Sequence, residues 1–241
     1  MDIEVLGELR VIENGVPITA PTPESRHVLA VLAAWPDQVV PVAVLADELA
    51  VHTPPEHARA LLHAAVRRLR ERFAEAMGAG SVRTPESVLS TRPGGYLLDT
   101  GGGRSDVREF ARESGAGYRA MGRGDFEQAA LRLRRALALW TGPALDGIDA
   151  GTWLGARLRV LDADRLAVLG QWVEAELALG RHRELRLELA GLRGRGGPAG
   201  RAAAHPDCPY LEALRIAEER VEAIRSACRT PRLTLAGAVR C

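Results

Sequence analysis

The stretch that decides the fold reads PEHARALLHAAVRRLRERF and covers residues 55–73. With about 100° between successive residues of a helix, its apolar residues share one side: Ala58, Leu62, Ala65, Val66, Leu69 and Phe73. Arg59, His63, Arg67 and Arg70 share the adjacent side. The pattern therefore predicts a helix that docks its apolar side on a core and presents a basic side outward.

Two shorter helices are predicted before this one. Thr22 can cap a helix that starts at Pro23 and runs to about Trp35, and residues 42–50 form a second apolar stripe. Upstream, Asn14-Gly15 is a strong hairpin signal among alternating apolar residues. Downstream, residues 88–98 read as a strand, an Arg-Pro-Gly-Gly turn and a second strand. This order of elements predicts a winged-helix domain over residues 1–99.

The basic side of the long helix suits a nucleic-acid contact. A recognition helix must be held rigidly while its outer side enters the major groove. The planar fork of arginine bonds guanine edges and phosphates with two N–H groups. Arg92 at the hairpin tip would reach the neighbouring backbone or minor groove. The candidate DNA-binding residues are Arg59, His63, Arg67, Arg68, Arg70 and Arg92.

A structural interpretation of the same residues stays open. Arginines on alanine-rich helices are often solvated and paired with acids one turn away, and Glu56, Glu71 and Glu75 are within that spacing. Arg68 and Arg72 point to other sides of the helix, where phosphate or an acidic partner would meet them.

The charge distribution supports the nucleic-acid interpretation. The 241 residues contain 32 basic and 31 acidic side chains, and every basic one is arginine. Residues 1–55 hold two arginines and eight acids, whereas residues 56–96 hold seven arginines and four acids. The near-neutral total therefore hides a basic block that coincides with the long helix and the hairpin.

Other classes of protein are disfavoured. No run of about 18 apolar residues predicts a membrane span, and residues 1–4 do not resemble a signal peptide. Three cysteines without metal-ligand spacing fit a reducing, cytoplasmic location. The chain has no HExxH, Gly-x-Ser-x-Gly or Walker motif, so we expect neither an enzyme nor a metal or other cofactor.

The second half is predicted to be entirely helical. Residues 100–105, with Gly101-Gly102-Gly103, form the predicted linker. Helices follow over 110–121, over 126–140, from Thr152 as a candidate cap, and around 185–192. Glycine-containing turns recur near residues 122 and 180, which favours stacked tetratricopeptide-like hairpins. After a Gly/Arg/Ala-rich loop, residues 209–228 form a last helix.

Several runs resemble a known family. They include Ile3-Glu4-Val5-Leu6-Gly7, Val66-Arg67-Arg68-Leu69-Arg70, Pro93-Gly94-Gly95-Tyr96-Leu97 and, in the second half, Leu139-Trp140-Thr141-Gly142-Pro143-Ala144-Leu145. With these runs the chain resembles the Streptomyces antibiotic regulatory protein family. The resemblance implies an OmpR-type winged helix, a bacterial transcriptional activation domain over 106–193 and a divergent region over 194–241. It also implies an activator of a biosynthetic gene cluster that binds direct repeats of double-stranded DNA as a homodimer and contacts RNA polymerase holoenzyme.

Three positions depart from the family pattern. Ala50 stands where a tryptophan is usual, and Leu61 and Ala65 stand where hydrogen-bonding side chains are expected. These departures leave an alternative open, in which the chain is a tetratricopeptide-like protein-interaction module with a degenerate, weakly DNA-binding winged helix.

Overall fold

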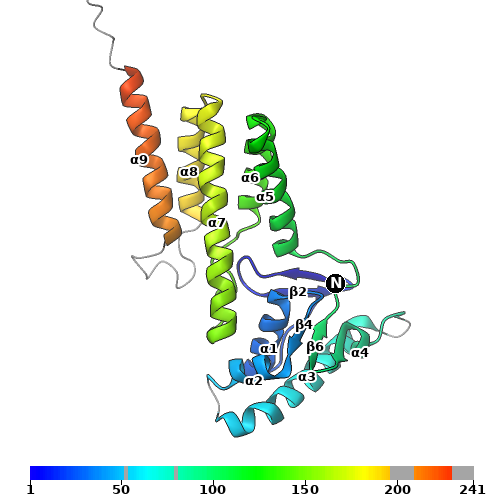
Figure 1. Cartoon of the computed structure of the whole chain (residues 1–241). Coiled ribbons are helices and arrows are strands. Elements are labelled where there is room, and N and C mark those ends of the chain that lie inside the picture. Colours follow the sequence, from blue (N-terminus) through cyan, green and yellow to red (C-terminus); the bar gives the residue numbers. More distant parts are fainter. Residues whose placement is uncertain (52–53, 79–80, 196–208, 230–241) are drawn as a thin grey trace, which may run out of the picture.

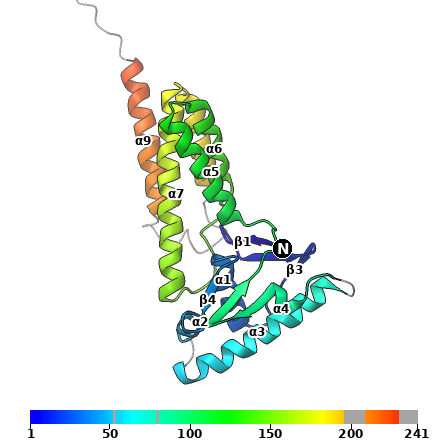
Figure 2. The same ribbon diagram turned by 45° about the vertical axis from the view of Figure 1, so that its right-hand side comes forward.

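The computed structural model describes residues 1–51, 54–78, 81–195 and 209–229. A mixed part, residues 1–99, lies at one end, and a stack of long helices rises from it (Figure 1). The two views agree that α7 reaches from the stack down to the mixed part (Figure 2). The predicted class, mainly α with an N-terminal winged helix, is confirmed.

The chain begins with a three-stranded antiparallel meander. It consists of β1 (Asp2–Glu4), β2 (Arg10–Glu13) and β3 (Val16–Pro17). Asn14 and Gly15 form the β2–β3 turn with φ angles of 51° and 81°. Both angles lie in the left-handed region that these two residue types tolerate, which confirms the predicted hairpin.

Three helices follow the meander. They are α1 (Pro23–Ala34), α2 (Val42–Leu49) and α3 (Pro55–Met77), with β4 (Val39–Pro41) between the first two. The Thr22 side chain accepts a hydrogen bond from the backbone N–H of Ser25, as a helix cap does. The apolar side of α3 is buried as predicted and packs against α1 and α2.

The wing closes the mixed part. It is the hairpin of β5 (Leu89–Arg92) and β6 (Gly95–Leu98), and the sheet order β4-β6-β5 makes β5 an edge strand. A one-turn helix, α4 (Pro85–Val88), precedes the wing. Thr84 and Ser87 form a reciprocal capping box at its start.

The helical part consists of five helices in the described residues: α5 (Asp106–Gly122), α6 (Phe126–Ala138), α7 (Thr152–Ala178), α8 (His182–Arg195) and α9 (Pro209–Arg229). Gly124 and Gly180 both have a φ of 72° at the turns that follow α5 and α7. The predicted glycine-turned hairpins are therefore present, and α9 packs on α7 and α8.

A set of buried contacts, here called the joint, connects the mixed and helical parts. Glu48 of α2 is only 1% exposed. Its carboxylate accepts backbone hydrogen bonds from Gly151, Trp153 and Leu154 at 2.7–2.9 Å, and His27 Nε2 lies 3.2 Å away. No side chain near the start of α7 caps the helix, so the prediction that Thr152 caps it is wrong. Glu48 accepts the hydrogen bonds of the first backbone N–H groups instead.

The joint continues at Val5 and Leu6, directly after β1. Asp106 at the start of α5 accepts hydrogen bonds from the backbone N–H groups of Val5 and Leu6 at 2.6 and 2.7 Å. In return, the Thr141 N–H donates to the Leu6 carbonyl at 2.8 Å. The loop before α7 therefore extends the hydrogen bonding of the N-terminal strand region.

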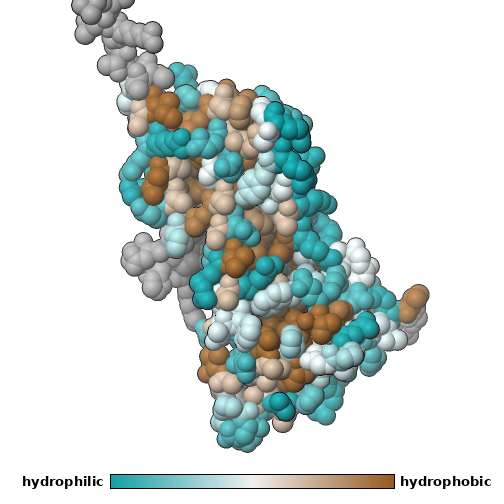
Figure 3. Space-filling view, viewed as in Figure 1, coloured by the Kyte–Doolittle hydropathy of each residue, from teal (hydrophilic) through white to brown (hydrophobic). Residues whose placement is uncertain are grey.

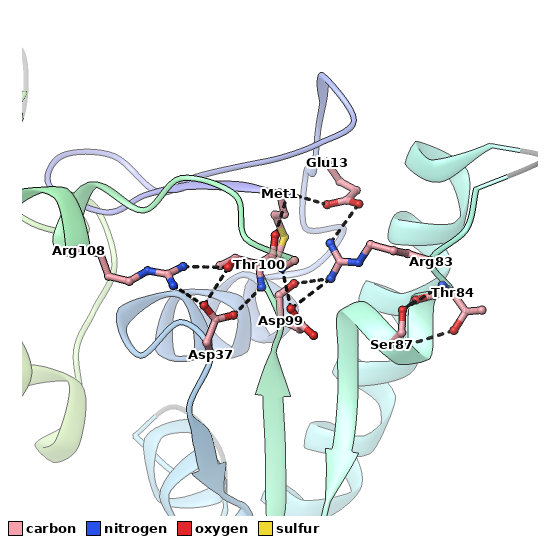
Figure 4. A network of polar contacts seen from close by, with 10 residues as sticks. Met1, Glu13, Asp37, Arg83, Thr84, Ser87, Asp99, Thr100 and Arg108 are labelled. Carbon is pink, nitrogen blue, oxygen red and sulfur yellow. Dashed lines mark hydrogen bonds and ion pairs between the residues drawn. The ribbon is translucent and has the colours of Figure 1, made fainter.

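The predicted linker is packed between the two parts. Thr100 donates its N–H and its hydroxyl to Asp37 at 2.7 and 2.8 Å, and Arg108 of α5 lies 2.5 Å from the same carboxylate (Figure 4). The N–H of Ile3 donates to the Arg104 carbonyl at 2.9 Å. These contacts make residues 100–105 a fixed connection.

Hydrophilic side chains cover most of the visible face of both parts, and hydrophobic ones gather in groups between them, one of them on the mixed part (Figure 3). None of the helices in the described residues has the length and apolar character needed to cross a membrane.

Candidate nucleic-acid interface

The outer side of α3 is positioned by the burial of its inner side. Leu62, Leu69 and Phe73 have no exposed surface, so the helix cannot rotate about its axis without exposing them. Arg59, His63 and Arg67 are consequently held outward in a row that is about one helical turn apart at each step. We call the row of Arg59, His63 and Arg67 the α3 face.

Two guanidinium groups of the α3 face are available to a ligand. Arg59 is exposed and has no hydrogen-bond or ion-pair partner among the described residues. Among the described residues, the partner of Arg67 is Glu71, whose carboxylate lies 3.9 Å from the Arg67 Nε, and both side chains are mostly exposed. Such exposed pairs contribute little in water and exchange readily for a stronger anion.

Arg70 differs from the other arginines predicted at this site. Its Nε and Nη2 donate to the Leu89 carbonyl at 3.0 and 2.8 Å, and Nη2 also donates to the Thr91 hydroxyl at 2.9 Å. The guanidinium therefore bonds the edge strand of the wing, although Arg70 lines the same groove as His63 and Arg67 of the α3 face.

His63 lies on the α3 face but has a partner in the wing. Its Nδ1 is 3.0 Å from the Tyr96 hydroxyl, and the two rings meet edge to face. Tyr96 is only 5% exposed, so this hydrogen bond satisfies a buried hydroxyl. One ring nitrogen of His63 is thus used inside the protein.

Arg68 is half-buried and lies on the side of α3 that faces the start of α1. The pKa of Glu24 is lowered, mainly by hydrogen bonds from its own backbone and from Thr22, and further by the positive charge of Arg68. Arg72 forms a 2.5 Å ion pair with Glu75. Acidic groups of the chain itself therefore face Arg68 and Arg72.

The wing places Arg92 at its tip. Arg92 is the last residue of β5 and pairs with Gly95, so only Pro93 and Gly94 form the turn. Proline followed by a glycine with a φ of 78° suits a tight turn of this length. Arg92 is exposed and has no partner among the described residues.

A groove of about 390 Å³ separates α3 from the wing and α4. Its lining includes His63, Arg67 and Arg70 of α3 and Tyr96 of the wing, together with the acidic Glu71 and Glu86. The two arginines and two glutamates of the lining balance, so the excess positive charge that a polyanion would meet on this surface comes from the exposed Arg59 and Arg92.

The three departures from the family pattern lie in or against the core. Ala65 is fully buried, so the expectation that a DNA-contacting side chain belongs at this position is wrong. Leu61 and Ala50 are partly buried and pack against the core cluster. Ala65 lies on the apolar side of α3, as its helical angle predicts and the family pattern does not.

Comparisons with known proteins identify the class of protein. Residues 105–225 match the family model described as "Bacterial transcriptional activator domain". The chain is 38% identical over 195 residues to Regulatory protein DnrI of Streptomyces peucetius, a match that covers 81% of this chain and 72% of DnrI. A winged helix joined to this activator domain defines a bacterial transcriptional regulator.

Two further matches share the same architecture. The chain is 34% identical over 192 residues to Transcriptional regulatory protein EmbR of Mycobacterium tuberculosis, covering 80% of this chain and 48% of EmbR. A solved structure of EmbR in complex with a low affinity phosphopeptide has a TM-score of 0.72 and 30% identity, and the match covers 93% of this chain and 55% of that one. The chain belongs to the Streptomyces antibiotic regulatory protein family of transcriptional activators.

Proposed function

We propose that this regulator is a sequence-specific DNA-binding activator of a secondary-metabolite gene cluster. The α3 face carries the proposal, because Arg59 and Arg67 are exposed on a helix whose opposite side is fully docked. The wing adds Arg92 on the other side of the groove. In this arrangement α3 enters the major groove and the wing follows the adjacent backbone.

Membership of the family supports the finer parts of the proposal. Two copies bind direct repeats as tandem protomers, and the helical part contacts RNA polymerase holoenzyme. Because the joint holds the two parts together, the orientation of the helical part on the promoter follows from that of α3.

The alternative, a protein-interaction module with a degenerate winged helix, loses part of its basis. It rested on Ala50, Leu61 and Ala65, and all three contribute to packing. Ala65 in particular lies on the buried side of α3, so an alanine at this position does not deprive the α3 face of a contact.

Arginine substitutions test the proposal on promoter DNA from the neighbouring genes. Arg67→Ala and Arg92→Ala are each expected to weaken binding by about 1–3 kcal/mol if they contact bases, or to lower the salt slope of log K by about one unit if they contact phosphate. Fluorescence anisotropy at several salt concentrations measures both quantities.

Arg72→Ala is the matched control, because it removes the same charge from a different side of the same helix, where Arg72 is paired with Glu75. The proposal fails if Arg67→Ala and Arg72→Ala bind the promoter equally well. Footprints on the same DNA report the tandem arrangement, since two protomers on direct repeats protect half-sites spaced by whole helical turns, about 10–10.5 base pairs each.

A further inference from the structure

Two side chains of α3 contact the same cross-strand pair of the wing, Thr91 and Tyr96, which we call the Thr91–Tyr96 rung. Arg70 donates to the Thr91 hydroxyl at 2.9 Å, and His63 Nδ1 lies 3.0 Å from the Tyr96 hydroxyl. Thr91 and Tyr96 are directly opposite each other in the β5–β6 register. Cross-strand partners project to the same side of a sheet, so both hydroxyls face α3.

The rung is adjacent to the tip of the wing. The next pair in the register is Arg92 and Gly95, and only the Pro93–Gly94 turn lies beyond it. A displacement of the Thr91–Tyr96 rung relative to α3 therefore moves Arg92 by a similar amount. The pairing of β6 with β4 and the hydrogen bond from the Val42 N–H to the Gly94 carbonyl at 2.9 Å hold the wing from the side of α2, and the Arg70 and His63 contacts hold it from the side of α3.

Arg70 has a geometry that fixes the strand in direction as well as distance. Two of its nitrogen atoms donate to one carbonyl, that of Leu89, and Nη2 also reaches Thr91 two residues along β5. Only the planar guanidinium offers several donors in such a rigid arrangement, whereas a lysine ammonium is a flexible point charge. The bonds also occupy an edge strand, where backbone groups otherwise lack a partner.

We propose that Arg70 is a positioning residue that fixes the wing relative to α3, with the His63–Tyr96 hydrogen bond as a second tie, and that Arg70 does not itself contact DNA. The inference rests on the proposed DNA-binding function. It reassigns a residue that the helical angle alone groups with Arg59 and His63.

A double-mutant cycle on promoter DNA tests the inference with Arg70→Ala, Arg92→Ala and the double variant. If Arg70 acts through the wing, each single substitution weakens binding, by roughly tenfold. The double variant then binds about as well as the weaker single variant, because both changes remove the same wing contact. The salt slope behaves in the same way, falling by about one unit in each single variant and by no further unit in the double variant.

The opposite result is equally clear. If Arg70 contacts DNA independently, the two losses of affinity multiply and the salt slope of the double variant falls by about two units. That outcome overturns the inference. So does full recovery of affinity in Arg70→Lys, which keeps the charge and lacks the fork.

A substitution that leaves the charge unchanged separates the effect of the hydrogen bond from a loss of folding or of long-range electrostatic attraction to DNA. Thr91→Val removes the hydrogen bond from Nη2 without changing the charge or the size of the residue, and it is expected to weaken binding by a few-fold in wild-type protein but not in Arg92→Ala. An equal loss in both backgrounds contradicts the inference. Circular dichroism melts establish that each variant is folded.

Failure of this inference is distinguishable from failure of the proposed function. Arg67→Ala probes the α3 face without altering the wing contacts. If Arg67→Ala weakens binding while Arg70 and Arg92 act independently, only the role of Arg70 is overturned. If Arg67→Ala binds as well as Arg72→Ala, the DNA-binding function itself fails.

Discussion

The joint and the α3 face use charged side chains in opposite ways. At the joint, the Glu48 carboxylate is buried and accepts three backbone N–H groups as well as lying beside His27. On the α3 face, Arg59 and Arg67 are exposed and have weak partners or none among the described residues. Charges that the fold itself satisfies hold the two parts together, and charges that it leaves unsatisfied gain most from an external anion.

The largest effect is expected at Glu48. Glu48→Ala leaves one buried and two part-buried N–H groups at the start of α7 without their acceptor and should lower the free energy of unfolding by about 3–5 kcal/mol. Urea unfolding measures the change. Glu71→Ala is the matched control on α3, where an exposed pair with Arg67 is removed, and it should change stability by less than about 0.5 kcal/mol. Similar losses in the two variants would show that the joint is no more dependent on its charge than the outer surface is.

A smaller effect is expected at Gly7, whose backbone lies close to the Thr141 side chain. A Cβ added at Gly7 would lie 1.9 Å from the Thr141 Oγ1, so Gly7→Ala must turn the Thr141 side chain or displace its loop and should cost about 1–3 kcal/mol. Gly170→Ala in α7 meets no atom within 4 Å and should stabilise the helix by about 0.5–1 kcal/mol. Thermal melts compare the two variants, and a neutral Gly7→Ala would mean that the contact is loose.

The smallest effect is a dependence on pH at Asp37. Burial acts to raise the pKa of Asp37, but hydrogen bonds from Thr100 and the charge of Arg108 outweigh it, so the pKa lies below its usual value. The stabilisation is therefore fully present above the unfolded-state pKa, about 3.9, and is lost as the pH falls through the lower folded-state pKa.

Asp37→Asn isolates this contribution. The difference in unfolding free energy between wild type and Asp37→Asn should be constant above about pH 5 and should shrink below about pH 4. Partial exposure of Asp37 and Arg108 keeps the effect modest and sensitive to salt. Unfolding curves from pH 2 to 6 provide the measurement. If the free energy of unfolding changes with pH in the same way in both proteins, the charge of Asp37 does not contribute to stability.

Local signals predicted much of the fold. Four features each depend on residues within a few positions of one another and can therefore be recognised in the sequence. They are the Thr22 cap, the Asn14–Gly15 turn, the apolar side of α3 and the wing. The hairpins of the helical part followed from the same kind of signal.

Contacts between distant residues were not predictable in this way. Glu48 lies in a short amphipathic helix and has no local feature that identifies it as the cap of α7, more than 100 residues away. Likewise, the helical angle of Arg70 matches the α3 face, but the position of the wing decides what its guanidinium bonds. Only the three-dimensional arrangement separates these roles.

The long sequence separation across the joint also bears on how the protein is made. Asp106 binds residues 100 and 101 positions earlier, and Glu48 binds residues 103 to 106 positions later. At roughly 5–20 residues per second, the ribosome delivers the partners of Glu48 about 5–20 s after Glu48 itself. During that interval the nascent N-terminal part carries a hydrated carboxylate at the end of α2, and the final closure of the joint is a late, non-local step in folding.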